Sequence, residues 1–121
     1  MSNSYTLYIV LNSDLKMTPG QMAAQVSHIT QIIVDDIIRS CYESMPVPAY
    51  YLNYQRWKQN PVTIILKASQ IELEKLRISV DPNETRSFID SGVRLGENIL
   101  TGVGFFPSDR LSDLFADYKL V

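Results

Sequence analysis

The chain has 121 residues, of which 45% are hydrophobic and 20% are charged, a composition that excludes wholesale disorder, collagen and low-complexity architectures. The length predicts one domain covering residues 1–121, because domains usually contain about 50–250 residues. Eleven Lys and Arg residues against 13 Asp and Glu residues give a formal charge of -2. This charge excludes a generally basic surface for nucleic acid, so any contact with RNA must be local.

The cysteine content and the hydropathy pattern predict a cytoplasmic protein. Cys41 is the single cysteine, so no internal disulfide can form. The sequence has no signal-peptide pattern, and its apolar runs are shorter than the roughly 18 residues of a membrane span. One His and one Cys offer few zinc ligands, so we expect neither a metal nor a cofactor.

The first two expected elements are a buried strand and a long helix. The strand is predicted at residues 5–11, where aromatic and β-branched residues dominate. The helix is predicted to begin at Pro19, with Thr18 as its N-cap and Gln21 placed to complete a capping box. It continues to near Glu43, and its apolar residues recur every three or four positions: Met22, Val26, Ile29, Ile33 and Ile37.

The rest of the chain predicts further alternation of helices and strands. We expect a helix at 49–58, a strand at 62–68, a helix at 70–77 after a Ser69–Glu72 capping box, a turn at 81–83 and strands at 86–90 and 99–106. A last helix is expected after Ser108, with four residues on its inner side: Leu111, Leu114, Phe115 and Tyr118. This order predicts an α/β fold with three αβα layers and a mixed sheet of about four strands, the last two strands pairing antiparallel.

Three features favour structural over chemical explanations. Ser27 and His28 are neighbours on the predicted helix, so they do not form a nucleophile–base pair, and a local hydrogen bond is the favoured role of His28. The Gly102–Gly104 segment lies inside a predicted strand, which indicates close packing rather than dinucleotide binding. The aromatic rings of residues 50–57 favour packing on the sheet over stacking on RNA bases.

Lys16 and Asp90 are predicted to lie at one edge of the sheet. Lys16 follows the first strand and Asp90 ends the third, so the two converge if these strands run parallel. The first turn of the long helix opens between them without an acidic residue, which leaves N–H groups available to a phosphate or carboxylate. The sequence therefore predicts an anion site; the alternative is a surface lysine and a turn-forming Asp-Ser-Gly.

Two blocks of residues resemble a known family. The first contains Asp14-Leu15-Lys16-Met17, Gly20 and Ala23-Ala24-Gln25-Val26-Ser27-His28, and the second contains Phe88-Ile89-Asp90-Ser91-Gly92 and Leu100-Thr101-Gly102-Val103-Gly104. Together they resemble the signature of the second-type peptidyl-tRNA hydrolases, the archaeal and eukaryotic family. The resemblance covers nearly the whole chain. It implies an α/β domain that cleaves the ester between a peptide and tRNA, with the acceptor end of peptidyl-tRNA as its partner.

The resemblance also implies roles for individual residues. Asp90 matches the catalytic aspartate of the family and is expected to orient water or a neighbouring cation. Residues expected to bind substrate are Lys16, Gln21, Gln25, His28 and Arg94. No membrane contact is expected, and a homodimer is compatible with the sequence.

Some residues differ from the family pattern. The family has Gly-Lys-Gly-Lys where this chain has residues 18–21, so Gln21 replaces the lysine regarded as catalytic. Arg94 replaces the functional threonine, and Leu95 replaces the glutamine that follows it. Arg94 would restore a positive charge at the site. The alternative functions are a catalytically impaired family member that binds tRNA or protein, and a hydrolase of another small ester or amide.

Overall fold

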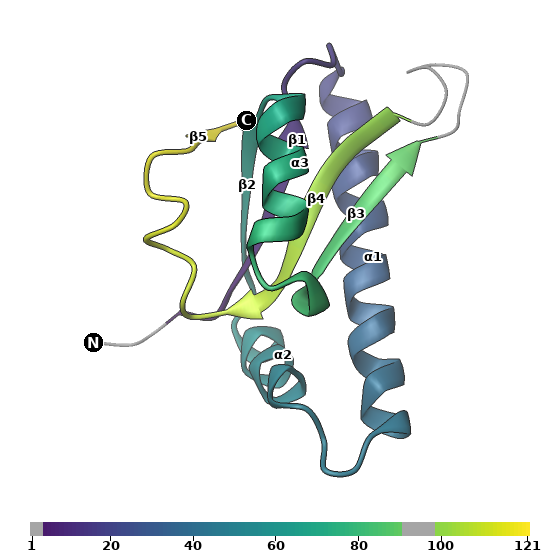
Figure 1. Ribbon diagram of the computed structural model, residues 1–121. Coiled ribbons are helices and arrows are strands. Elements are labelled where there is room, and N and C mark those ends of the chain that lie inside the picture. Colours follow the sequence, from purple (N-terminus) through teal and green to yellow (C-terminus); the bar gives the residue numbers. More distant parts are fainter. Residues whose placement is uncertain (1–3, 91–98) are drawn as a thin grey trace.

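The computed structural model describes residues 4–90 and 99–121, which form one mixed sheet with helices on both faces (Figure 1). The elements are β1 (Thr6–Asn12), α1 (Pro19–Glu43), α2 (Ala49–Gln59), β2 (Val62–Ala68), α3 (Gln70–Ser79), the 3-10 turn η1 (Pro82–Glu84), β3 (Thr85–Asp90), β4 (Ile99–Ser108) and β5 (Lys119–Leu120). The described strands are ordered β3-β4-β1-β2-β5. The αβα architecture predicted from the sequence is therefore confirmed, with β5 as an added edge strand of 2 residues.

The strand directions bring three carboxyl ends to one edge of the sheet. β1 and β2 are parallel, with Thr6 opposite Val62 and Asn12 opposite Ala68. β4 runs antiparallel to both β1 and β3, which confirms the antiparallel pair expected from the sequence. Because β1, β2 and β3 therefore run in the same direction, Asn12, Ala68 and Asp90 all end at the same edge.

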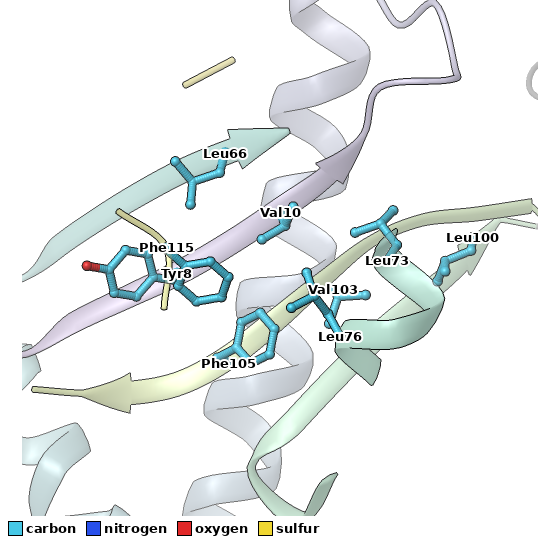
Figure 2. Packing of buried hydrophobic residues seen from close by; sticks show 9 residues of the cluster. All are labelled: Tyr8, Val10, Leu66, Leu73, Leu76, Leu100, Val103, Phe105 and Phe115. Carbon is cyan, nitrogen blue, oxygen red and sulfur yellow. The ribbon is translucent and has the colours of Figure 1, made fainter. Parts of the chain in front are cut away.

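Two apolar layers enclose the sheet. Every residue of β1 is buried, because its side chains alternate between a face covered by helices α1 and α2 and a face covered by α3. Of the apolar stripe predicted on α1, Ile29, Ile33 and Ile37 are buried, whereas Met22 and Val26 are partly buried. The buried residues of this layer are Leu7, Ile9, Leu11, Ile29, Ile33, Ile37, Tyr54 and Phe106. Figure 2 shows the other layer: Tyr8, Val10, Leu66, Leu73, Leu76, Leu100, Val103, Phe105 and Phe115.

Helix α2 packs on the sheet through its aromatic residues, as the sequence favoured. Tyr54 is buried, and the Tyr50 ring meets Phe106 edge-on with 5.0 Å between centroids. Trp57 Nε1 donates a hydrogen bond to the carbonyl oxygen of Val62, at 2.9 Å. These contacts fix α2 against the start of β2 and against β4.

The prediction of a helix after Ser108 is wrong. Residues 109–118 form turns, and β5 then pairs antiparallel with β2 at Leu66 and Lys67. Phe115 N donates to Leu111 O at 3.2 Å, which makes one helical turn, but the chain leaves this turn to reach the sheet edge. Phe115 is buried as expected, whereas Leu114 is 42% exposed. Pairing with β2 therefore overrides the local helical spacing of the apolar residues.

The second predicted capping box is present only in part. Ser69 Oγ accepts a hydrogen bond from Glu72 N at 3.3 Å, as a helix N-cap does. The Glu72 carboxylate instead accepts a hydrogen bond from the Tyr118 hydroxyl, at 2.9 Å. Burial of Tyr118, followed by this contact with Glu72, raises the pKa of the tyrosine to about 12.

We expect Tyr118 to make folding stability depend on alkaline pH. An unfolded tyrosine ionises near pH 10, whereas folded Tyr118 holds its proton to about pH 12. The stabilisation is therefore fully present below about pH 10 and is lost as the pH rises through about 12. Thermal unfolding between pH 9 and 12 should show a steeper loss of stability for the wild type than for Tyr118→Phe. Equal slopes for the two proteins would contradict this assignment.

Candidate functional site

Asp90 ends β3 and meets Gln25 of α1. The Asp90 side chain is half-buried, and its Oδ2 lies 3.5 Å from Gln25 Nε2, at the outer limit of a hydrogen bond. The two residues are 65 positions apart in the chain. The structure therefore brings together two of the residues predicted to form the site.

Thr101 of β4 holds the other side of the Gln25 amide. Its Oγ1 lies 2.9 Å from Gln25 Oε1 and 3.1 Å from the carbonyl oxygen of Phe88. Gln25 is 5% exposed and Thr101 is 0% exposed, so water does not compete strongly for these contacts. Thr101 was not among the residues predicted to form the site. The sequence gives one indication of its role, because Thr101 is a hydroxyl residue in a segment of glycine and apolar residues.

Asn12, at the carboxyl end of β1, forms hydrogen bonds with α3 and β4. Its Nδ2 donates to Gln70 Oε1 at 2.6 Å and to Leu100 O at 2.8 Å, and the residue is 2% exposed. Asp14 Oδ2 accepts a hydrogen bond from Gln70 N at 2.9 Å. These contacts fix the start of α3 and the start of β4 beside the end of β1. The strand predicted at residues 5–11 ended one residue before Asn12, and these contacts were not expected.

Gln21 is part of the helix cap of α1. Thr18 Oγ1 accepts from Gln21 N at 3.1 Å, and Gln21 Oε1 accepts from Thr18 N at 2.9 Å. The capping box predicted from the sequence is therefore confirmed, and such caps stabilise a protein by about 1 kcal/mol. Because the side-chain oxygen of Gln21 is engaged with Thr18, this residue serves the helix start.

Lys16 lies at the same edge of the sheet, exposed in the connection between β1 and α1. It lines a hollow of about 230 Å³ together with Leu11, Asn12, Ser13, Leu15, Met17, Met22, Lys67 and Val121. Asp90 is not among the described residues that line this hollow. The first turn of α1 carries no acidic residue, but Pro19 has no N–H and the N–H of Gln21 donates to Thr18 Oγ1, so the prediction that this turn leaves its N–H groups available to an anion is largely wrong. The direct approach of Lys16 to Asp90 remains a prediction.

His28 lies one turn beyond Gln25 on α1, and its side chain is exposed. Its ring stacks on Phe88 of β3, with 4.8 Å between centroids and 22° between planes. Within the described part of the chain, this ring contact takes the place of the local hydrogen bond expected for His28. Arg94 lies outside the described residues.

The opposite end of β3 holds a different group of charges. A hollow of about 260 Å³ there is lined by Val80, Asp81, Glu84, Thr85, Phe105, Phe106, Ser108, Arg110 and Leu111. Burial, and then the nearby Asp81 carboxylate, raise the pKa of Glu84, whereas Arg110 lowers it. The six residues of β3 separate this acidic pair from the carboxyl edge at which Asp90 and Gln25 meet.

Residues 4–90 and 99–121 present neither a metal cluster nor a membrane span. Within these ranges no group of three or more His, Cys, Asp or Glu side chains is arranged to hold a metal ion. None of the helices described there combines the length and the apolar character needed to cross a membrane.

The contacts of Asp90 suit it for acid–base chemistry with water. An ionised carboxylate is an acceptor in hydrogen bonds, so it can hold a water molecule and take a proton from it. The Gln25 amide, itself in contact with Thr101, lies against this carboxylate from the buried side. The arrangement is therefore suited to hydrolysis of an ester or amide at the carboxyl edge of the sheet.

Comparisons with known proteins show what the whole chain resembles. The family model described as Peptidyl-tRNA hydrolase PTH2 matches residues 5–121, a range that contains every described helix and strand. Proteins named peptidyl-tRNA hydrolase from Saccharolobus islandicus strains L.S.2.15, M.14.25 and Y.G.57.14 are each 30% identical to this chain over 129 residues. Each alignment covers 95% of this chain and 98% of the relative.

Proposed function

Because the chain belongs to the PTH2 family of peptidyl-tRNA hydrolases, we propose that it hydrolyses the ester joining a peptide to the 3′-terminal ribose of tRNA. The family itself was predicted from the two motif blocks, and the match confirms it. The observation that carries the proposed activity is the Asp90 carboxylate at the end of β3, with the buried amide of Gln25 3.5 Å away.

In the proposed reaction, Asp90 orients a water molecule and accepts its proton while the water oxygen attacks the ester carbonyl carbon. The tetrahedral intermediate then breaks its bond to the ribose oxygen, which takes up the proton. The products are a peptide with a free carboxyl group and a tRNA with a free terminal hydroxyl.

The negative oxygen that forms during attack needs a hydrogen-bond donor or a cation. Lys16 and the positive end of the α1 helix dipole lie at the same edge of the sheet as Asp90 and support this part of the proposal. The same groups suit the phosphates of the tRNA acceptor end. Peptidyl-tRNA is therefore the substrate that we propose for this edge.

Gln21 favours a second candidate function. Both its backbone N–H and its side-chain oxygen are engaged with Thr18, and it provides no positive charge where the family has lysine. A neutral amide stabilises a developing oxyanion less than a cation does. The second candidate is a tRNA- or protein-binding module that keeps the fold without hydrolysis.

One assay separates the two functions. The purified chain is incubated with peptidyl-tRNA or with an N-blocked aminoacyl-tRNA, and the released tRNA is measured over several turnovers. Multiple turnovers support the hydrolase. Absence of release, combined with tRNA binding that weakens as salt is raised, supports the binding module. A binding constant independent of salt would argue against contacts with tRNA phosphates.

A further inference from the structure

Thr101 and Gln25 are buried polar residues behind Asp90, and neither is placed to contact solvent. We propose that Thr101 is a positioning residue. Its hydroxyl group can donate to the Gln25 amide or accept from it, so it holds the amide in place whichever end faces Asp90 and lets the amide serve both protonation states of the carboxyl group. The proposal deepens the proposed hydrolysis and rests on it for its catalytic consequence. Its structural part depends on four groups in a row: Phe88 O, Thr101, Gln25 and Asp90.

The first arrangement applies when Asp90 is ionised. A carboxylate accepts hydrogen bonds and donates none, so Gln25 must face it with Nε2, at 3.5 Å. Gln25 Oε1 then faces Thr101, and the Thr101 hydroxyl must donate to it across 2.9 Å. The hydroxyl has one hydrogen, so in this arrangement it does not donate to Phe88 O.

The second arrangement applies when Asp90 carries a proton. The carboxylic acid then donates to Gln25 Oε1, and the amide turns by half a rotation so that Nε2 donates to Thr101 Oγ1. The freed hydroxyl hydrogen points to Phe88 O, which is 3.1 Å away in the structure. Thr101, Gln25 and Asp90 each keep a partner in both arrangements, because hydroxyl and amide groups can each donate and accept, whereas Phe88 O accepts from Thr101 only in the second.

The rotation of the Gln25 amide matters during hydrolysis because Asp90 changes its protonation state within the reaction. It takes a proton from the attacking water and passes that proton to the leaving ribose oxygen. The row from Phe88 O to Gln25 offers a donor to the ionised carboxylate and an acceptor to the protonated carboxyl group. Both states are thereby stabilised from the side that water does not reach.

Thr101→Val tests the kinetic consequence, since valine has nearly the same shape but lacks the hydroxyl. We expect kcat to fall about tenfold, the effect of losing one hydrogen bond linked to a charged group, with KM changed less than about twofold. Thr101→Ser should restore kcat to within about twofold of the wild type. Thr85→Val is the matched control, because Thr85 is also buried and bonded to carbonyl oxygens, but at the other end of β3.

A double variant separates positioning from a general loss of structure. In a Gln25→Leu background the amide is absent, so adding Thr101→Val should lower kcat little further. If Thr101→Val lowers kcat by the same factor with and without the Gln25 amide, the proposal is overturned. It is also overturned if Thr85→Val lowers kcat as much as Thr101→Val does.

A measurement without substrate decides the structural part independently of the activity. In nuclear magnetic resonance spectra, the two side-chain amide hydrogens of Gln25 should exchange slowly with solvent in the wild type and in Thr101→Ser, and several-fold faster in Thr101→Val. Unchanged exchange in Thr101→Val overturns the role of Thr101. If the wild type releases no tRNA but the exchange result holds, the proposed hydrolysis fails and the positioning of Gln25 stands.

Discussion

Replacing Asp90 by Asn is expected to lower the kcat of peptidyl-tRNA hydrolysis by about a hundred- to ten-thousandfold, the range that a general base contributes. Asparagine has the same size, and its Oδ1 can still accept the hydrogen bond from Gln25 Nε2. It does not take a proton from water at neutral pH. The variant should therefore fold and bind tRNA normally while the release of tRNA in a single turnover becomes slow.

Asp113→Asn provides the matched control for this change. Asp113 is exposed in the turns before β5, and its replacement removes the same charge. We expect the control to keep wild-type kcat, and both variants to unfold at nearly the wild-type temperature. If Asp90→Asn hydrolyses peptidyl-tRNA within about threefold of the wild type, Asp90 does not act as the base, and the binding-module function becomes the better one.

The family resemblance placed Gln25 and Asp90 in one predicted site because both lie in the motif blocks, although the neighbour predicted for Asp90 was Lys16. The contacts of Thr101 and Asn12 with other parts of the chain were not predicted. Thr101 and Asn12 act across 76 and 88 residues, so local spacing carries no sign of their partners. Their roles follow from burial, because a buried polar group must find a partner wherever the fold supplies one.

The helices and strands also divide into those that local sequence predicts and those that depend on distant segments. The start of α1 was predictable because Thr18, Pro19 and Gln21 act within one turn. The segment after Ser108 was mispredicted because its apolar spacing suits a helix, but β2 has an open edge that pairs with β5. Local interactions thus determine where α1 starts, while pairing with the distant strand β2 determines the structure of the segment after Ser108.

Gly104→Ala is expected to destabilise the protein more than a surface substitution would, because α1 lies directly on this part of β4. A Cβ atom at residue 104 would be 2.5 Å from Ile29 Cγ2 and 2.7 Å from Ile33 Cδ1. The same holds for Gly102, where a Cβ would be 2.8 Å from Ile29 Cδ1. The close packing predicted for the Gly102–Gly104 segment is therefore confirmed, and neither glycine is part of a nucleotide-binding loop.

We expect Gly104→Ala to lower the free energy of unfolding by about 1–3 kcal/mol, the usual cost of overpacking a core. Thermal or urea unfolding measures this loss. Gly20→Ala is the control, since a Cβ there meets only Thr18 Oγ1 at 3.9 Å and alanine favours a helix. The control should be neutral or slightly stabilising. Equal stability of Gly104→Ala and the wild type would show that α1 can move away from β4 at little cost.

The same substitution should also affect hydrolysis, because Ile29 lies one helical turn after Gln25. Thr101 lies on the same strand as Gly104, so moving α1 away from β4 lengthens the contact between Gln25 and Thr101. Ile29→Ala removes the Cγ2 atom that an added Cβ would meet, so Gly104→Ala and Ile29→Ala together should destabilise less than the sum of the two single changes. Strict additivity would contradict this packing, and the glycines would then matter for a reason other than the approach of α1.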